Sequence, residues 1–341
     1  MKYVKIEDLK PGMISIKNIY NENNVKLLGK NTPLTISIIE KMKRIGYQGL
    51  FIYDEYSKFE DITEIIDESQ RIKMIDALQQ VNIDKIIYFS NDIVDTLLEQ
   101  DEICLDFNEL RNYHNSTYEH SINVAMLSAS CGIGLGLNNE QLKELTTAAM
   151  LHDIGKENIP LEILDKPGKL TKEERELINL HPQFGYDMLK NNTNITSTIR
   201  VSVLEHHENF DGTGYPRNLA GDDIYLYARI IHVADVYDAL CSKRAYKDDY
   251  APSESIEYLM ANCGSMCDIN IVSTFLKYVV VYPVGTDVTL SNGETAHVIK
   301  NRSQFVLRPV VMTATGKKLD LAKDKKCFSI TIVKNNPNGY N

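Results

Sequence analysis

The sequence predicts a mainly helical protein, with a helical bundle over residues 113–280 between a small N-terminal α/β unit and a small C-terminal β-rich extension. Three patterns support this prediction. Apolar residues recur at helical spacing through the middle of the chain, and strand-like alternation is confined to its two ends. Seven of the eight histidines fall between residues 114 and 232, which indicates that the functional site also lies in the middle region.

The composition is that of an ordinary globular protein of 341 residues, with 43% apolar residues and a formal net charge of −10. This acidic balance argues against nucleic acid as a partner, but it is compatible with a small anionic ligand. No apolar run reaches the roughly 18 residues that a membrane span needs, so we expect a cytoplasmic protein with no membrane partner. Six scattered cysteines form no Cys-x-x-Cys pair and are expected to be reduced thiols.

Residues 1–55 are predicted to form the α/β unit, for which the sequence suggests no ligand. One helix should begin after Thr35, whose hydroxyl can cap it, and end at Gly46. Strands are expected at residues 3–6, 14–16 and 50–53. Residues 56–112 are acidic and helix-patterned, as expected for connecting helices that carry a signal or form a dimer seam. The pattern leaves a homodimer open and is too short to predict a coiled coil.

Two predicted helices of the bundle carry histidine on an apolar background. His120 lies within a helix whose apolar face runs through residues 118–129. His152 lies on the apolar side of the next helix, which Gly155 is expected to end. Both imidazoles are therefore expected to face the interior.

Further along the bundle, Thr171 and Glu174 form a capping box that should open a helix carrying His181 near its end. Asp235 lies in an apolar helix over residues 228–240. Between them, an apolar helical run ends at the adjacent His206 and His207, followed by a loop with two glycines that closes on Tyr215-Pro216.

Residues 281–341 are predicted to form the β-rich extension, as a packing lid or dimer element. Asn292-Gly293 between alternating segments predicts a hairpin with a type I′ turn. Further strands are expected at residues 305–307 and 330–333, and His297 is expected on the surface.

Buried aspartates next to histidines predict a metal site in the bundle. A buried carboxylate without a partner costs several kcal/mol, and few lysines or arginines lie on these helices. Metal ions are the economical partners, with imidazoles completing the shell. A single core histidine is more often a satisfied hydrogen-bonding group, and we assign such structural roles to His114 and His232. The candidate ligands are His120, His152, Asp153, His181, His206, His207 and Asp235.

Seven candidate ligands are more than the protein side chains that one metal ion usually coordinates. Two ions bridged by a carboxylate and a hydroxide therefore fit better. Imidazole and carboxylate ligands without thiolate point to iron, manganese or zinc. Such a pair activates hydroxide at neutral pH and polarises phosphoryl oxygens. The reaction class that this implies is phosphodiester hydrolysis.

These motifs, in this order, resemble the HD-GYP subgroup of the HD phosphohydrolase superfamily, over roughly residues 84–280. The resemblance rests on His152-Asp153-Ile154-Gly155-Lys156 and on His206-His207-Glu208 followed by Asp211-Gly212-Thr213-Gly214-Tyr215-Pro216. It implies an all-helical, HD-type catalytic domain that hydrolyses cyclic di-GMP to linear pGpG by attack of a metal-bridging hydroxide, and in some members on to GMP. It also implies two divalent ions, Fe or Mn first, with Zn, Ni and Mg as further candidates.

By position, the resemblance assigns the same seven metal ligands, with Asp153 bridging the ions as a catalytic residue. Lys156 is a second candidate catalytic residue, as proton donor to the leaving 3′ oxygen. Lys156, Tyr215, Arg244 and Lys247 match positions that contact the substrate. The Gly-Tyr-Pro loop is also a candidate docking surface for a diguanylate cyclase or an effector protein, although the same loop could be only a tight turn.

Three positions depart from the family pattern. Some members bind a third metal through a glutamate at the position of Ser116, so we expect two metals here. Glu119 is a poor substitute, because it precedes His120 directly and its side chain should point about 100° away from that of His120 around the helix. Cys267 replaces a common phenylalanine, and Cys241 replaces a small hydroxyl residue. We expect both to act in packing, with oxidation sensitivity as the alternative for Cys241.

Two alternatives to the cyclic di-GMP phosphodiesterase remain open. The first is a catalytically weak or inactive protein that senses the dinucleotide or docks on a cyclase. The second is an HD hydrolase of another cyclic dinucleotide or mononucleotide. Binding without turnover would favour the first, and side-by-side turnover of cyclic di-GMP and a mixed cyclic GMP-AMP dinucleotide would identify the second.

Overall fold

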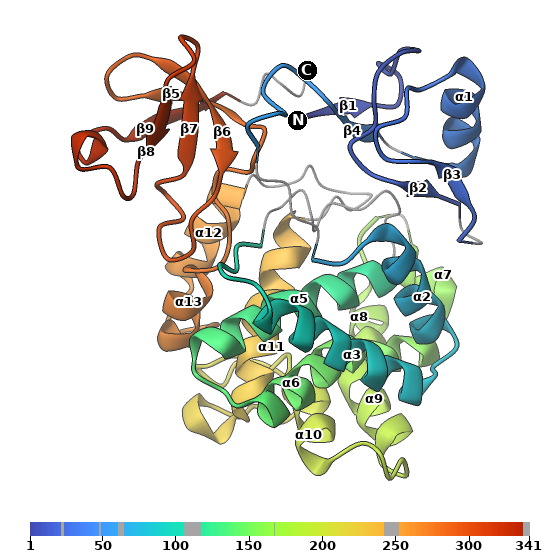
Figure 1. The fold of residues 1–341 in the computed structure, drawn as a ribbon. Coiled ribbons are helices and arrows are strands. Elements are labelled where there is room, and N and C mark those ends of the chain that lie inside the picture. Colours follow the sequence, from blue (N-terminus) through green and yellow to red (C-terminus); the bar gives the residue numbers. More distant parts are fainter. Residues whose placement is uncertain are drawn as a thin grey trace. The chain divides into compact units, whose positions relative to one another are not determined.

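The computed structural model describes the chain except for residues 22–23, 48, 61–64, 106–116, 167, 242–251 and 337–341. It divides into two compact units, which are described separately (Figure 1). The first unit combines Met1–Lys73, Cys104–His114 and Val279–Asn341, and the second combines Met74–Ile103 and Asn115–Tyr278. Both ends of the chain therefore belong to one unit. The division into four segments at residues 55, 112 and 280 stays a prediction.

The second unit is a helical bundle, which confirms the predicted fold class. Helix α5 packs against α6 and α11, and α6 also packs against α3 and α10 (Figure 1). Its α-helices are α2 (Glu68–Gln79, shared with the first unit), α3 (Ile83–Leu98), α5 (Thr117–Gly134), α6 (Asn139–Leu151), α7 (Leu161–Leu164), α8 (Lys172–Ile178), α9 (His181–Leu189), α10 (Ser197–Glu205), α11 (Leu226–Cys241), α12 (Pro252–Ala261) and α13 (Ile269–Phe275). Short 3₁₀ segments, η1 (Ile154–Asn158) and η2 (Gly221–Asp223), lie between them. None of the helices described is long and apolar enough to cross a membrane.

Two helix boundaries around the histidines differ from the sequence prediction. The capping box of Thr171 and Glu174 is confirmed, but the helix that it opens ends at Ile178, and His181 begins a new helix. Pro182 explains the break, because proline suits the first turn of a helix and cannot continue one from its interior.

The prediction that Gly155 ends the His152 helix is also wrong. That helix ends at Leu151, and Gly155 lies within the 3₁₀ segment that follows. A Cβ on Gly155 would meet the carbonyl oxygen of His181 at 2.0 Å. Glycine is therefore needed here because the backbone segments that carry Asp153 and His181 approach each other closely.

In the first unit, the N-terminal segment contains β1 (Lys2–Lys5), β2 (Ile19–Tyr20), β3 (Lys26–Leu28), α1 (Ile36–Ile45) and β4 (Gly49–Ile52). Strand β1 pairs antiparallel with β4, and β2 pairs with β3. The predicted ends of α1 are confirmed, because the Thr35 hydroxyl accepts the Ile38 N–H and Gly46 has a φ of 92°. The strand predicted at residues 14–16 is reduced to isolated bridges at Ile14 and Ser15.

The C-terminal segment forms a five-stranded antiparallel sheet in the order β8-β7-β6-β5-β9. Its strands are β5 (Asp287–Leu290), β6 (Thr295–Lys300), β7 (Val310–Thr313), β8 (Lys318–Asp320) and β9 (Ile332–Asn336), with a 3₁₀ segment η3 (Lys325–Cys327) before the last. Phe51 of β4 shares a buried cluster with Val284, which ties the two ends of the chain together.

Three predictions for this segment need correction. The strand expected at residues 305–307 is wrong, because the chain turns there, with Leu307 60% exposed. The hairpin is present, but Leu290 donates to the Glu294 carbonyl across Ser291–Gly293, so the loop has three residues rather than a two-residue type I′ turn. His297 was expected on the surface and is only 4% exposed.

Candidate metal centre

The structure brings all seven candidate ligands together in the helical unit. They come from α5, from the ends of α6 and α10, from the start of α9 and from the middle of α11. The imidazole rings form a chain of neighbours, with centroids 5.3 Å apart for His120 and His152, 5.0 Å for His152 and His206, and 4.1 Å for His206 and His207. The side chains that the sequence separates by more than 100 residues therefore share one pocket.

Helix ends fix the orientation of three imidazoles. The Nδ1 atoms of His152, His181 and His206 lie 2.7, 2.8 and 2.7 Å from the backbone carbonyl oxygens of the residues three positions earlier, Ala149, Ile178 and Val203. These carbonyls belong to the last turns of α6, α8 and α10, where the helix leaves acceptor capacity for a side chain. Because each Nδ1–H donates there, each Nε2 is left with a lone pair that points into the site.

His120 is oriented by a carboxylate instead. Its Nδ1 lies 2.7 Å from Asp238 Oδ2, while Nε2 lies 2.9 Å from Asp235 Oδ1. Asn123 donates to the other oxygen of Asp238 at 3.0 Å. Burial lowers the pKa of His120, but Asp235 and Asp238 outweigh it and raise the pKa to about 10.

At the centre of the pocket, acceptor atoms face one another. Nε2 of His181 lies 3.2 Å from Nε2 of His206 and 3.2 Å from Asp153 Oδ1, although its proton is directed at Ile178. Asp153 Oδ1 and His152 Nε2 are both buried without a hydrogen-bond partner among the described residues. Lone pairs that converge in this way repel one another unless a cation lies between them, so the donor set fits a metal ion.

The ligand atoms form two overlapping groups. One contains Asp153, His181, His206 and His207, and the other contains His120, His152 and Asp153, with the atoms of each group within 4.8 Å of one another. Asp153 belongs to both groups. Asp235 contacts one member of each group. Its Oδ1 lies 2.9 Å from His120 Nε2, and its Oδ2 lies 3.9 Å from His207 Nδ1.

The protonation states of His206, His207 and Asp153 suit metal binding. Burial and the neighbouring imidazoles hold the pKa values of His206 and His207 well below the usual range, so both rings are neutral. Burial alone would raise the pKa of Asp153, but Lys156 and the surrounding histidines hold it well below its usual range. Neutral imidazoles and ionised carboxylates are the forms that bind metals.

Two of the predicted substrate-contacting residues lie beside this pocket. The Lys156 ammonium forms an ion pair with Asp153 Oδ2. The Tyr215 ring stacks on His207 at 4.9 Å, and burial raises the pKa of its hydroxyl. Arg244, Lys247, Ser116 and His114 lie outside the described residues.

The glycine-rich loop is held by carboxylates that the sequence interpretation missed. Glu208 accepts the backbone N–H groups of Arg217, at 2.6 Å, and Leu219, at 3.1 Å. Glu205 accepts the Tyr225 N–H and the Arg217 guanidinium. Gly214 fits against the chain at Asn209, whose nitrogen a Cβ would meet at 2.1 Å. The loop is therefore built to present Tyr215 beside His207.

His232 and Asp238 support the ligands, and the sequence interpretation missed only the second. His232 was assigned a structural role, and it donates from Nδ1 to the His206 carbonyl at 2.8 Å. Asp238, which holds His120, lies three residues after Asp235 and therefore on the same side of α11. That spacing was the available signal. Glu119, next to His120, is buried, and Cys241 and Cys267 are buried cysteines outside any disulfide, as expected for packing residues.

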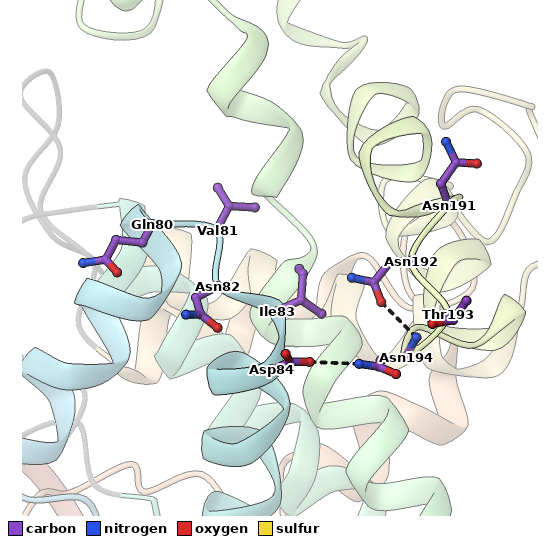
Figure 2. Close-up of a pocket in the computed structure, with 9 residues that line it drawn as sticks. All are labelled: Gln80, Val81, Asn82, Ile83, Asp84, Asn191, Asn192, Thr193 and Asn194. Atoms are coloured by element: carbon purple, nitrogen blue, oxygen red, sulfur yellow. Dashed lines mark hydrogen bonds between the residues drawn. The ribbon is translucent and has the colours of Figure 1, made fainter.

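The helical unit also contains a polar hollow whose lining residues differ from those of the candidate metal centre. Figure 2 shows it between the α2–α3 turn and the loop after α9. Its volume is about 620 Å³. Its walls are residues 80–84 and 191–194, and an Asn194–Asp84 hydrogen bond of 2.9 Å crosses it. It contains none of the candidate site residues.

Comparison with known proteins relates this chain to proteins with an HD domain. Residues 103–271 match a family model described as HD domain. A cyclic di-GMP phosphodiesterase of Pseudomonas aeruginosa is 37% identical over 226 residues, which cover 65% of this chain and 54% of that protein. A cyclic di-GMP phosphodiesterase response regulator of Xanthomonas campestris is 42% identical over 144 residues, which cover 42% of this chain and 38% of that protein.

Other relatives have a different named substrate. A 3′3′-cGAMP-specific phosphodiesterase of Vibrio cholerae is 36% identical over 163 residues, covering 48% of this chain and 31% of that protein. Among solved structures, an HDGYP protein from Bdellovibrio bacteriovorus shares the fold, with a TM-score of 0.52 and 17% identity over 80% of this chain and 97% of that one. The chain thus spans about half the length of the Pseudomonas relative and less of the others.

Proposed function

Because residues 103–271 belong to the HD domain family, we propose that this protein is a metal-dependent phosphodiesterase that hydrolyses cyclic di-GMP to linear pGpG. One observation carries the proposal. The Nδ1 atoms of three imidazoles face backbone carbonyls, which leaves their Nε2 atoms to face Asp153 and one another. His181 Nε2 lies 3.2 Å from Asp153 Oδ1 and 3.2 Å from His206 Nε2. His152 Nε2 lies 3.4 Å from Asp153 Oδ2. A bound metal ion would satisfy such a set, and two similar proteins are named cyclic di-GMP phosphodiesterases.

Two divalent ions are the proposed cofactor, because Asp153 belongs to both ligand groups and can place one oxygen on each ion. The donor set of imidazole and carboxylate suits Fe and Mn, and it also accepts Zn. When bound, such ions lower the pKa of water and polarise a phosphoryl oxygen.

The chain's own residues supply positioning and proton transfer. Lys156, which forms an ion pair with Asp153, is the proposed proton donor to the 3′ oxygen that leaves the phosphate. The Tyr215 hydroxyl, kept protonated by burial, can donate a hydrogen bond to a phosphate oxygen beside His207. Arg244 and Lys247 remain predicted phosphate contacts, since guanidinium and ammonium groups pair with phosphate.

The test is turnover of cyclic di-GMP by the full chain, purified anaerobically and supplied with Fe²⁺ or Mn²⁺. We expect pGpG as the first product, and GMP only later if at all. Asp153→Asn should abolish turnover, whereas the control Asp165→Asn, which changes an exposed carboxylate in the same unit, should retain it. Tight binding of the dinucleotide without turnover by the metal-loaded protein would instead identify a sensor or docking protein.

A second substrate deserves a direct comparison, because relatives of similar identity are named as specific for 3′3′-cGAMP. Parallel assays with the two cyclic dinucleotides should give a higher kcat/KM for cyclic di-GMP. The reverse ratio would keep the reaction class and reassign the substrate. The loop over residues 208–217 stays the proposed docking surface for a cyclase or effector protein.

A further inference from the structure

A second cluster of metal-ligating side chains lies in the unit formed by the two ends of the chain. Asp54 and Glu60 follow β4, and His297 lies on β6. One ligand atom from each lies within 4.8 Å of the others. None of these residues belongs to the helical unit that holds the proposed catalytic centre.

His297 is oriented as metal-binding histidines are. Its Nδ1 lies 2.8 Å from Asp287 Oδ1, and its Nε2 lies 2.9 Å from Glu60 Oε1. The Tyr56 ring stacks on the imidazole at 4.3 Å and fixes its plane. Nδ1 faces Asp287, so Nε2 is the ring atom directed at the two other members of the cluster.

Glu60 is the least satisfied member. Its side chain is fully buried, and Oε2 has no hydrogen-bond partner among the described residues. A buried carboxylate is costly unless a cation and hydrogen bonds compensate it. Oε1 contacts the Met1 ammonium and His297 Nε2, so Oε2 is the oxygen that lacks a partner among the described residues.

Asp54 is held in place by its own turn. Its Oδ1 accepts the N–H groups of Tyr56 and Ser57 and the Ser57 hydroxyl. The amino nitrogen of Met1 contacts Glu60 and lies 3.2 Å from the same Asp54 oxygen. The cluster thus already attracts positive charge, with the carboxylates of Asp54, Glu60 and Asp287 gathered around one imidazole.

We propose that Asp54, Glu60 and His297 form a second divalent-metal site, structural in role and distinct from the catalytic centre. One imidazole with two carboxylates suits Zn²⁺ or Mn²⁺ better than Ca²⁺, which prefers oxygen ligands alone. The metal joins Glu60 to His297 across 237 residues of sequence. Such a link stabilises the folded unit, because binding that requires the folded arrangement is folding free energy.

The test measures Zn²⁺ retained by the full chain in a background that cannot load the catalytic centre, Asp153→Ala with His206→Ala. After dialysis, elemental analysis should find one equivalent of Zn²⁺ in this background. Adding His297→Gln should remove it, and adding Glu55→Gln, an exposed carboxylate beside Asp54, should not. Zn²⁺ should also raise Tm in the background and not in the His297→Gln protein.

If circular dichroism shows that the background variant does not fold, the same comparison is made in the wild-type chain. There, His297→Gln should hold one metal equivalent fewer than Glu55→Gln. Equal metal contents in these two proteins, in either background, would overturn the proposal. The cluster would then be an imidazolium–carboxylate ion pair, in which the proton on Nε2 replaces the metal.

Discussion

The two histidine–carboxylate clusters hold their imidazoles by different acceptors. In the helical unit, three histidines donate Nδ1–H to backbone carbonyls three residues earlier, in the last turns of α6, α8 and α10. In the unit formed by the chain ends, His297 donates to the side chain of Asp287 on the neighbouring strand. A helix end offers unpaired carbonyls wherever a helix stops, whereas a carboxylate must be supplied by another residue.

This difference shows that helix ends can orient most of the imidazoles of a histidine cluster without a distant side chain. The backbone sets the tautomer and the ring direction of each histidine, and packing of the helices brings the Nε2 atoms together. His120 lies within a helix, where the carbonyls are already used, and it needs Asp238. The comparison can be tested by removing ligands and their acceptors one at a time.

The largest effect is expected from removing a helix-end ligand. His206→Ala should lower turnover of the cyclic dinucleotide by about 10³-fold or more, because metal ions contribute several kcal/mol to transition-state stabilisation. His297→Gln, the matched change in the other cluster, should leave turnover unchanged. The measurement is initial rate at saturating Mn²⁺. Wild-type turnover in His206→Ala would break the assignment of this cluster as the catalytic one.

A smaller effect is expected from the carboxylate that orients His120. Asp238→Asn should reduce metal affinity or activity 10- to 100-fold, as changes to residues behind a metal ligand typically do. Raising the metal concentration should recover part of the rate, which a purely structural defect would not allow. Asp223→Asn, an exposed carboxylate before α11, is the control. Identical metal titrations for the two variants would contradict the role given to Asp238.

The helix-end geometry explains why the sequence was enough to predict that the seven candidate ligands lie together. His152 and His206 follow apolar helical runs directly, and the capping box before His181 marks the start of a helix that ends at Ile178. The motifs also supplied the resemblance to the HD family, which is confirmed. Local patterns specify helix starts and ends, and these starts and ends place the ligands.

What the sequence could not give depends on contacts between distant segments. His297 was expected on the surface, but Asp287, Tyr56 and Glu60 contact it in the folded unit. Gly155 was interpreted as a helix stop, whereas its role is the close approach to His181. The strand expected at residues 305–307 shows the same limit, because a short apolar run does not say whether a sheet is there to receive it.

The carboxylate behind the glycine-rich loop offers a finer test. Glu208→Gln keeps one acceptor oxygen but loses a charged hydrogen bond to a backbone N–H of Arg217 or Leu219, about 1.5–3 kcal/mol. We expect KM to rise about tenfold, because the loop carries Tyr215. Metal content should stay at the wild-type level, and Glu162→Gln should change neither quantity. Loss of metal with unchanged KM would place Glu208 behind the ligands rather than behind the loop.

The smallest effect should come from the acceptor of His297, and it contrasts directly with Asp238. Both carboxylates accept an Nδ1–H, at 2.8 Å for Asp287 and 2.7 Å for Asp238, but the Asp287 side chain is 52% exposed and that of Asp238 is 2% exposed. Water screens an exposed pair, so Asp287→Asn should cost less than about 1 kcal/mol in the free energy of unfolding by urea. Removing the buried partner leaves a polar group unpaired, and Asp238→Asn should cost more. Equal costs would show that burial does not distinguish the two acceptors, and that the sheet holds His297 as firmly as the helices hold His120.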